Sequence, residues 1–170
     1  MSSDDPFRDL EELIRRVYAY VAYRLGEGPD ADDVTSETFA RALRRQETYD
    51  PAKGPPIAWL LGIARRCISE LVATQAIPSA TVAETSDGTA FEDGALRRIE
   101  VARAVATLPP RDRELVALRY GADFTARQIG ELVGMRTNAV EVALHRALAQ
   151  IRPLLAPDAG DDLRVAAQPL

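Results

Sequence analysis

The chain has 170 residues, of which 28% are charged and 46% hydrophobic, and its net charge of −5 gives an isoelectric point of about 5.0. This length allows one large or two small domains, each able to bury a core. The acidic balance argues against a general nucleic-acid binder, which would usually be basic. Residues 1–50 carry twelve acidic residues against seven arginines, whereas residues 99–156 carry eight arginines against six acidic residues. This asymmetry predicts two modules with different partners.

Cys67 is the single cysteine, so no disulfide can form within the chain and no cysteine cluster can bind zinc. Its apolar surroundings predict a small buried side chain. The N-terminus, MSSDDPF, is acidic and polar, which does not fit a secretory signal. Since no apolar run approaches the roughly 20 residues that cross a bilayer, we expect a cytoplasmic protein without membrane insertion.

The first half of the chain predicts three helices. The first is expected to begin near residues 4–6, where Asp and Pro suit a helix start, and to end at Gly26. A second helix should begin at Asp30 or Asp32, where acidic residues suit the positive end of the helix dipole. Its inward face is predicted to hold these apolar residues: Val34, Phe39, Ala42 and Leu43.

A rigid loop is predicted at residues 49–56, YDPAKGPP, because three prolines and a glycine disfavour a helix or a central strand. Pro56 should open the third helix, with Trp59 in or near its core. From residue 73 or 74 to 92 the composition shifts to Pro, Ser, Thr, Ala and Gly, which is typical of a flexible linker. We therefore expect domains at 1–73 and 93–156, followed by a loose tail at 157–170.

The second half predicts helices only. One should stop at the Pro109–Pro110 pair, and another should begin at Arg111 or Asp112 and close at Gly121. Thr125 and Gln128 then have capping-box spacing, and Gly134 suits a helix C-terminus. The fold class is therefore all-α, with two small helical domains.

The stretch from Thr125 to Leu155 reads as two helices around a tight glycine turn. Apolar residues recur in the second helix at steps of three and four, among them Val140, Leu144 and Ile151. A short helix, a glycine turn and a helix with one polar face form a helix-turn-helix, whose second helix can enter a DNA major groove. Such a hairpin is also common in ordinary bundles, so spacing alone leaves both interpretations open.

Three segments carry a family resemblance. DDVTSETFARA at 32–42 resembles the polymerase-binding helix of bacterial sigma factors, usually close to E-D-L-V-Q-E-T-F-x-R-A. The loop at 49–56 with WLLGIARR at 59–66 resembles their promoter-melting segment, and LPPRDRE at 108–114 resembles the entry to their fourth region. Two domains around a linker are similar to the small extracytoplasmic-function (ECF) group of the sigma-70 family.

This resemblance implies the partners and the residues that meet them. The partners would be the RNA polymerase core, promoter DNA and an anti-sigma factor, with no cofactor or metal. The core polymerase would be bound by Asp32, Asp33, Ser36, Glu37 and Arg41. The minus-ten DNA, including a flipped base of the opened strand, would be held by Tyr49, Lys53, Trp59, Arg65 and Arg66. The minus-thirty-five DNA would meet Thr125, Arg136, Thr137, Asn138, Glu141, His145 and Arg146.

The chain departs from the family pattern at several positions. Ser36 stands where the family usually has Gln, and Glu141 and Ala143 stand where it usually has Lys or Arg. Fewer cations mean weaker phosphate attraction. An alternative is therefore a sigma-like protein that binds polymerase or an anti-sigma factor with weak or lost promoter recognition.

A helix-turn-helix repressor with an unrelated N-terminal domain is a further alternative. Such a protein would usually dimerise to read paired half-sites. An enzyme is not expected, because the single histidine, His145, lies on the presumed DNA face and no phosphate loop, metal cluster or nucleophile motif is present.

Overall fold

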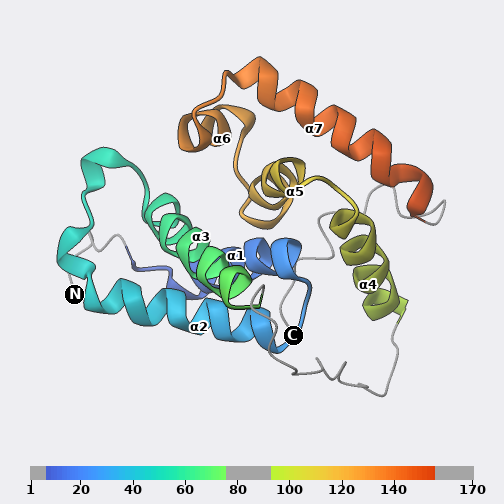
Figure 1. The fold of residues 1–170 in the computed structure, drawn as a ribbon. Helices are drawn as coiled ribbons and strands as arrows, with labels where there is room; N and C mark the ends of the chain where they lie inside the picture. Colours follow the sequence, from blue (N-terminus) through green and yellow to red (C-terminus); the bar gives the residue numbers. More distant parts are fainter. Residues whose placement is uncertain (1–6, 76–92, 156–170) are drawn as a thin grey trace.

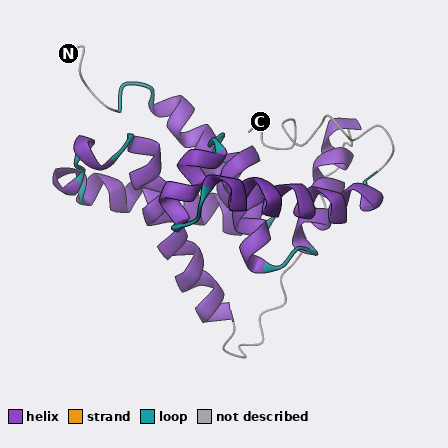
Figure 2. Cartoon of the chain, turned by 90° about the horizontal axis from the view of Figure 1, so that it is seen from above, coloured by secondary structure: helices purple, strands orange, loops and turns teal. Residues whose placement is uncertain are grey.

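The structure, a computed structural model, describes residues 7–75 and 93–155. Within these ranges every regular element is a helix, as Figure 2 shows, which confirms the predicted all-α class. The longer helices are α1 (Leu10–Leu25), α2 (Pro29–Arg44), α3 (Pro56–Gln75), α4 (Asp93–Ala106), α5 (Pro110–Val116), α6 (Ala126–Val133) and α7 (Thr137–Ile151). Three short turns lie between helices, namely η1 (Gln46–Thr48), η2 (Pro51–Lys53) and η3 (Ala117–Gly121), and a fourth, η4 (Arg152–Leu154), follows α7.

Helix α1 begins later than its sequence predicts. Its N-cap is Asp9, whose side chain accepts a hydrogen bond from the Glu12 amide at 3.2 Å, and Phe7 lies in the turn before it. The expected start near residues 4–6 is therefore wrong by several residues, because the acceptor that satisfies the first-turn amides comes from Asp9. The predicted end is confirmed, since Gly26 takes a positive φ of 86°.

Helices α1, α2 and α3 pack on one another as a three-helix unit (Figure 1). Val34 and Ala42 face its core as predicted, and Phe39 is half-buried. The prediction for Leu43 is wrong, because this side chain is 74% exposed. Leu43 follows the buried Ala42 directly, so the helical step of about 100° turns it away from the core. Cys67 is buried in α3, as expected.

The second unit consists of α4, α5, η3, α6 and α7. It contains the predicted helix-turn-helix in α6 and α7. Thr125 Oγ1 accepts from the Gln128 amide at 3.2 Å, and Gln128 Oε1 accepts from the Thr125 amide at 2.9 Å, which completes a capping box. Gly134 ends α6 in the left-handed conformation, with φ 72°. Helix α7 then packs on α5 and α6 through its buried stripe, which includes Val140 and Ile151.

Helix α5 continues into η3, a turn of π-helix that the sequence did not predict. The Ala122 amide donates to the Ala117 carbonyl at 3.0 Å, a separation of five residues. This turn packs on α1 of the first unit, and Figure 1 shows α5 and η3 beside α1. The two units are thus in direct contact, which makes their buried residues one continuous core.

Gly121 allows η3 to approach α1 closely. A Cβ atom at this position would lie 2.8 Å from the Cα and the backbone nitrogen of Tyr20, closer than real side chains come. Tyr20 itself is fully buried. The glycine is therefore required by the contact between the two units rather than by its own backbone conformation.

The predicted linker at 74–92 and the tail at 157–170 fall almost entirely outside the described residues, and helix α3 itself runs to Gln75. The domain boundaries stay predictions. In the ranges that the structure describes, none of the helices combines the length and the apolarity needed to cross a bilayer.

Candidate nucleic-acid interface

The acidic face of α2 lies on the surface of the first unit. Asp32, Asp33 and Ser36 are exposed, and Glu37 is half-exposed on the same helix. Arg41 donates through Nε to Glu37 at 2.7 Å and forms an ion pair with Glu70 of α3 at 2.6 Å. The guanidinium hydrogen bond holds the pKa of the Glu37 carboxyl below its usual range. Arg41 thus joins the Glu37 carboxylate of α2 to the Glu70 carboxylate of α3.

Three aromatic rings gather beside the loop at residues 49–56. Tyr49 and Trp59 have centroids 5.6 Å apart, and Phe7 lies 5.3 Å from the first ring and 5.9 Å from the second. The Tyr49 hydroxyl donates to the Gly54 carbonyl at 3.1 Å, which fixes the ring on its own loop. Tyr49 and Trp59 are half-buried and Lys53 is exposed at the rim. The sequence predicted the loop and Trp59 but not the part of Phe7.

A cavity of about 190 Å³ opens between this loop and Trp59. Its walls come from Tyr49, Pro55 and Trp59 of the first unit and from Leu132 of α6 in the second unit. Base–aromatic stacking needs an exposed ring face in a preformed pocket. The rings of Tyr49 and Trp59 line this cavity together with Pro55, and Leu132 forms another part of its wall.

Arg65 and Arg66, the two predicted minus-ten arginines of α3, have different surroundings. Arg66 is exposed. Arg65 is 40% exposed and forms an ion pair through Nε with Glu114 of α5 at 3.2 Å. The Glu114 carboxylate is only 12% exposed and also accepts from the Tyr20 hydroxyl at 2.8 Å and pairs with Arg24. One carboxylate of the second unit therefore binds three groups of the first.

The predicted minus-thirty-five residues lie on or beside α7, and all of them are exposed. Arg136 is its N-cap, and the remaining α7 members are Thr137, Asn138, Glu141, His145 and Arg146. Steps of three and four place Asn138, Glu141 and His145 on one face. Thr125 stands apart at the start of α6, where its hydroxyl serves the capping box. Helix α7 thus presents an exposed polar face of mixed charge.

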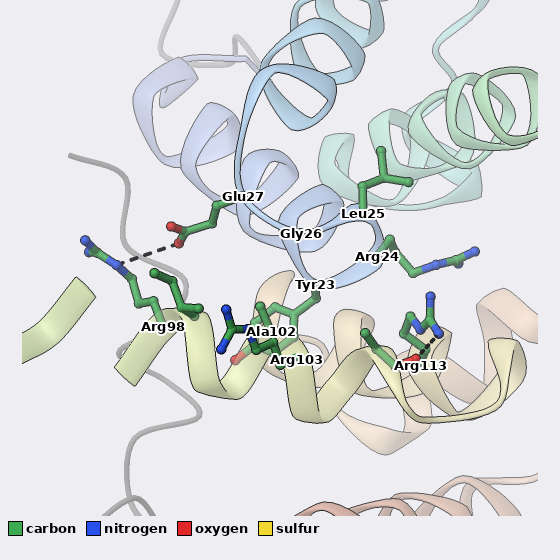
Figure 3. A pocket seen from close by; sticks show the side chains of 11 residues that line it. Tyr23, Arg24, Leu25, Gly26, Glu27, Arg98, Ala102, Arg103 and Arg113 are labelled. Carbon is green, nitrogen blue, oxygen red and sulfur yellow. Dashed lines mark hydrogen bonds and ion pairs between the residues drawn. The ribbon is translucent and has the colours of Figure 1, made fainter. Parts of the chain in front are cut away.

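A second cavity, of about 310 Å³, lies between the end of α1 and α4 (Figure 3). Four arginines line it: Arg24, Arg98, Arg103 and Arg113. Glu27 pairs with Arg98 at 3.7 Å, and burial raises the pKa of the Glu27 carboxyl. Burial, and then repulsion from Arg24, lower the pKa of Arg113. Sequence reasoning missed this cluster, because its members come from both units and no local motif connects them.

Comparison with known proteins supports the same architecture. Residues 10–76 match the family model Sigma-70 region 2, and residues 98–151 match Sigma-70, region 4. The chain is 32% identical over 151 residues to the ECF RNA polymerase sigma factor BldN of Streptomyces coelicolor, covering 84% of this chain and 57% of BldN. It is 31% identical over 134 residues to the ECF sigma factor ShbA of Streptomyces griseus, covering 72% of this chain and 70% of ShbA.

Two solved structures share the fold. The sigma factor RpoE of Bartonella quintana, in complex with the anti-sigma factor NepR, has a TM-score of 0.66 at 17% identity, covering 89% of this chain and 96% of RpoE. CnrH, in complex with the cytosolic domain of CnrY, has a TM-score of 0.63 at 22% identity, covering 88% of this chain and 85% of CnrH. The chain spans somewhat over half the length of BldN. Both family models match in order and a relative above 30% identity is covered over two thirds of its length, so the chain belongs to the ECF group of the sigma-70 family of sigma factors.

Proposed function

We propose that this protein is a promoter-specificity subunit of RNA polymerase, acting in the cytoplasm and having no enzymatic activity of its own. The observation that carries the proposal is the joint exposure of two different surfaces in the order the family requires. These are the acidic face of α2 in the first unit and the polar face of α7 in the second.

The acidic face would bind a basic surface of the polymerase core. Asp32, Asp33 and Ser36 are exposed, and the half-exposed Glu37 carboxylate lies on the same helix, where it accepts a hydrogen bond from Arg41. Complementary charges speed association and fix the orientation of the partners.

The DNA contacts would divide between the two units. Near the minus-ten element, Tyr49 and Trp59 offer aromatic surface for an unstacked base, while Lys53, Arg65 and Arg66 supply charge for the strand backbone. At the minus-thirty-five element, Asn138 suits an adenine edge and Glu141 can accept from cytosine. Arg136 and Arg146 would hold phosphates or guanine.

An anti-sigma factor is the further partner that we propose. The sigma factor RpoE, which shares this fold, has been solved with the anti-sigma factor NepR, and CnrH, which also shares it, has been solved with the cytosolic domain of CnrY. A protein that covers one or both of the exposed surfaces would prevent their use.

Run-off transcription tests the proposal. Purified protein is added to core polymerase with fragmented genomic DNA from the host, and transcripts are mapped. We expect discrete start sites that are absent with core polymerase alone. If the protein neither binds core polymerase nor directs initiation at any promoter, the proposal fails.

A second candidate is a sigma-like protein that binds polymerase or an anti-sigma factor without reading DNA strongly. Glu141 motivates it, because this exposed carboxylate stands in the middle of the α7 face and repels phosphates. Polymerase binding without any start site would favour this candidate over the first.

A further inference from the structure

The cavity between the end of α1 and α4 holds more positive than negative charge. Two of its four arginines have carboxylate partners, in the pairs Arg24–Glu114 and Arg98–Glu27. The other two, Arg103 and Arg113, form no ion pair with any carboxylate whose side chain the structure describes. With these arginines and carboxylates all charged, the site keeps a surplus of two positive charges.

Two guanidinium groups of this cavity also carry hydrogen-bond donors that the described residues do not use. Nε of Arg98 and Nε of Arg113 are buried, and neither has an acceptor among the residues that the structure describes. Arg113 is held in place by its Nη2, which donates to the carbonyl oxygens of Ala106 and Leu108. Because buried polar groups nearly always have a partner, these fixed donors point to a ligand that supplies acceptor oxygens.

Like charges are held close together in the cavity. Figure 3 shows the Arg98–Glu27 pair at one end and Arg24 beside Arg113 at the other. Burial, followed by repulsion from Arg24, lowers the pKa of Arg113. An anion bound beside these groups would offset that repulsion, which is stronger away from water. The planar fork of a guanidinium matches the oxygens of a phosphoryl group and can bind two of them at once.

The size and lining of the cavity fit a small phosphorylated molecule. Its volume of about 310 Å³ lies at the lower end of the range of about 300–1,000 Å³ for small-molecule sites. Apolar wall comes from Leu25, Ile99 and Ala102, which can cover the organic part of a ligand. A phosphate monoester carries about −1.5 to −2 charges at pH 7, which balances the surplus charge of the arginines.

We propose that this cavity is a binding site for the phosphoryl group of a small molecule, held by Arg103 and Arg113 next to the apolar wall formed by Ile99 and Ala102. The phosphoryl group could belong to an organic phosphate such as a nucleotide or to free phosphate, and the experiment below distinguishes these two sources. The inference goes beyond the proposed function and does not depend on it, because binding is measured without polymerase or promoter DNA.

The experiment titrates the full chain with AMP, inorganic phosphate and adenosine in a calorimeter, at about 0.15 M salt. Arg103→Gln removes one unpaired cation from an exposed position, and Arg103→Lys keeps the charge but loses the planar fork. Arg45→Gln is the matched control, because Arg45 is exposed at the far end of α2, about 24 Å of helix away from the cavity. Circular dichroism and thermal unfolding establish that each variant is folded.

We expect AMP to bind one-to-one and to raise the unfolding temperature, because a ligand that binds only the folded form stabilises it. Affinity should fall about tenfold in Arg103→Gln, fall less in Arg103→Lys and stay within twofold of the parent in Arg45→Gln. Adenosine, which lacks the phosphoryl group, should not bind.

The comparison of AMP with inorganic phosphate identifies the source of the phosphoryl group. Tighter binding of AMP supports an organic phosphate, and equal affinities support the free anion at the same arginines. Dissociation constants above about 1 mM for both, or equal losses of affinity in Arg103→Gln and Arg45→Gln, would overturn the proposal. It would also be overturned if AMP did not bind and Arg103→Gln weakened binding of a short DNA duplex, because the arginines would then contact DNA phosphates.

Discussion

Arg16 of α1 donates through Nε to the carbonyl oxygen of Ala122 at 2.8 Å, although the two residues are 106 positions apart. The same guanidinium lies over the Phe124 ring, 5.7 Å from its centroid. Burial lowers the pKa of the Arg16 guanidinium, whose side chain is half-buried. The first helix is thereby attached to the segment that leads into the helix-turn-helix.

Arg16→Ala should therefore destabilise the folded protein. It leaves the Ala122 carbonyl without its donor, and a lost hydrogen bond to a charged group costs about 1.5–3 kcal/mol. The measurement is the free energy of unfolding in urea. Arg15→Ala is the control, because Arg15 pairs with Glu12 on the surface, where such pairs contribute less than about 1 kcal/mol. An equal decrease in the free energy of unfolding in the two variants would contradict a stabilising role for the Arg16–Ala122 hydrogen bond.

Thr125→Ala should lower the free energy of unfolding by about 1 kcal/mol, because it removes the acceptor for the Gln128 amide. Thr125→Ser keeps that acceptor and should stay close to the parent in thermal unfolding. Duplex promoter binding by the serine variant then separates the two roles of Thr125. If serine restores stability but not DNA affinity, the threonine methyl group itself contacts the DNA.

Glu141→Lys should strengthen binding to promoter duplex in the presence of polymerase. It removes a repulsive carboxylate and adds a cation on the exposed face of α7, so the slope of log affinity against log salt should steepen by about one. Glu100→Lys makes the same charge change at an exposed position on α4 and should alter the slope less. Identical slopes in the two variants would mean that α7 does not face the duplex.

Asp33→Lys should weaken binding to core polymerase, because like charges would then meet across the interface. We expect a loss of about tenfold in affinity, which corresponds to about 1.4 kcal/mol. Asp33 is exposed on α2, so thermal unfolding should change little. Affinity is measured by fluorescence with labelled protein. The control is Glu11→Lys, an exposed charge reversal on α1; if it weakens binding as much, the effect is one of net charge rather than of the α2 face.

Local signals predicted local structure well. Thr125, Gln128 and Gly134 specify the helix-turn-helix through backbone hydrogen bonds within a few residues, and all three behave as expected. Two local predictions, the start of α1 and the burial of Leu43, were wrong. Asp9 caps α1 although earlier residues also suit a helix start, and Leu43 lies outside the core although it is apolar.

Contacts between the units could not be predicted in the same way. Glu114 belongs to a motif that marks the entry to the second unit, yet its partners Tyr20, Arg24 and Arg65 lie far away in the chain. Gly121 was expected to close a helix, whereas its lack of a side chain serves the approach to Tyr20. Such roles depend on tertiary packing, for which one sequence offers no periodicity to follow.

The π-helical turn at Ala117–Gly121 sets the direction in which the following helices leave. A π turn holds one residue more than the α-helical turn it replaces. Removing a single residue here would rewind the segment and rotate everything after it by about 100°, the angle of one helical step. Single-residue deletions in this turn would therefore change which side of α7 is offered to a promoter without altering any residue that reads it.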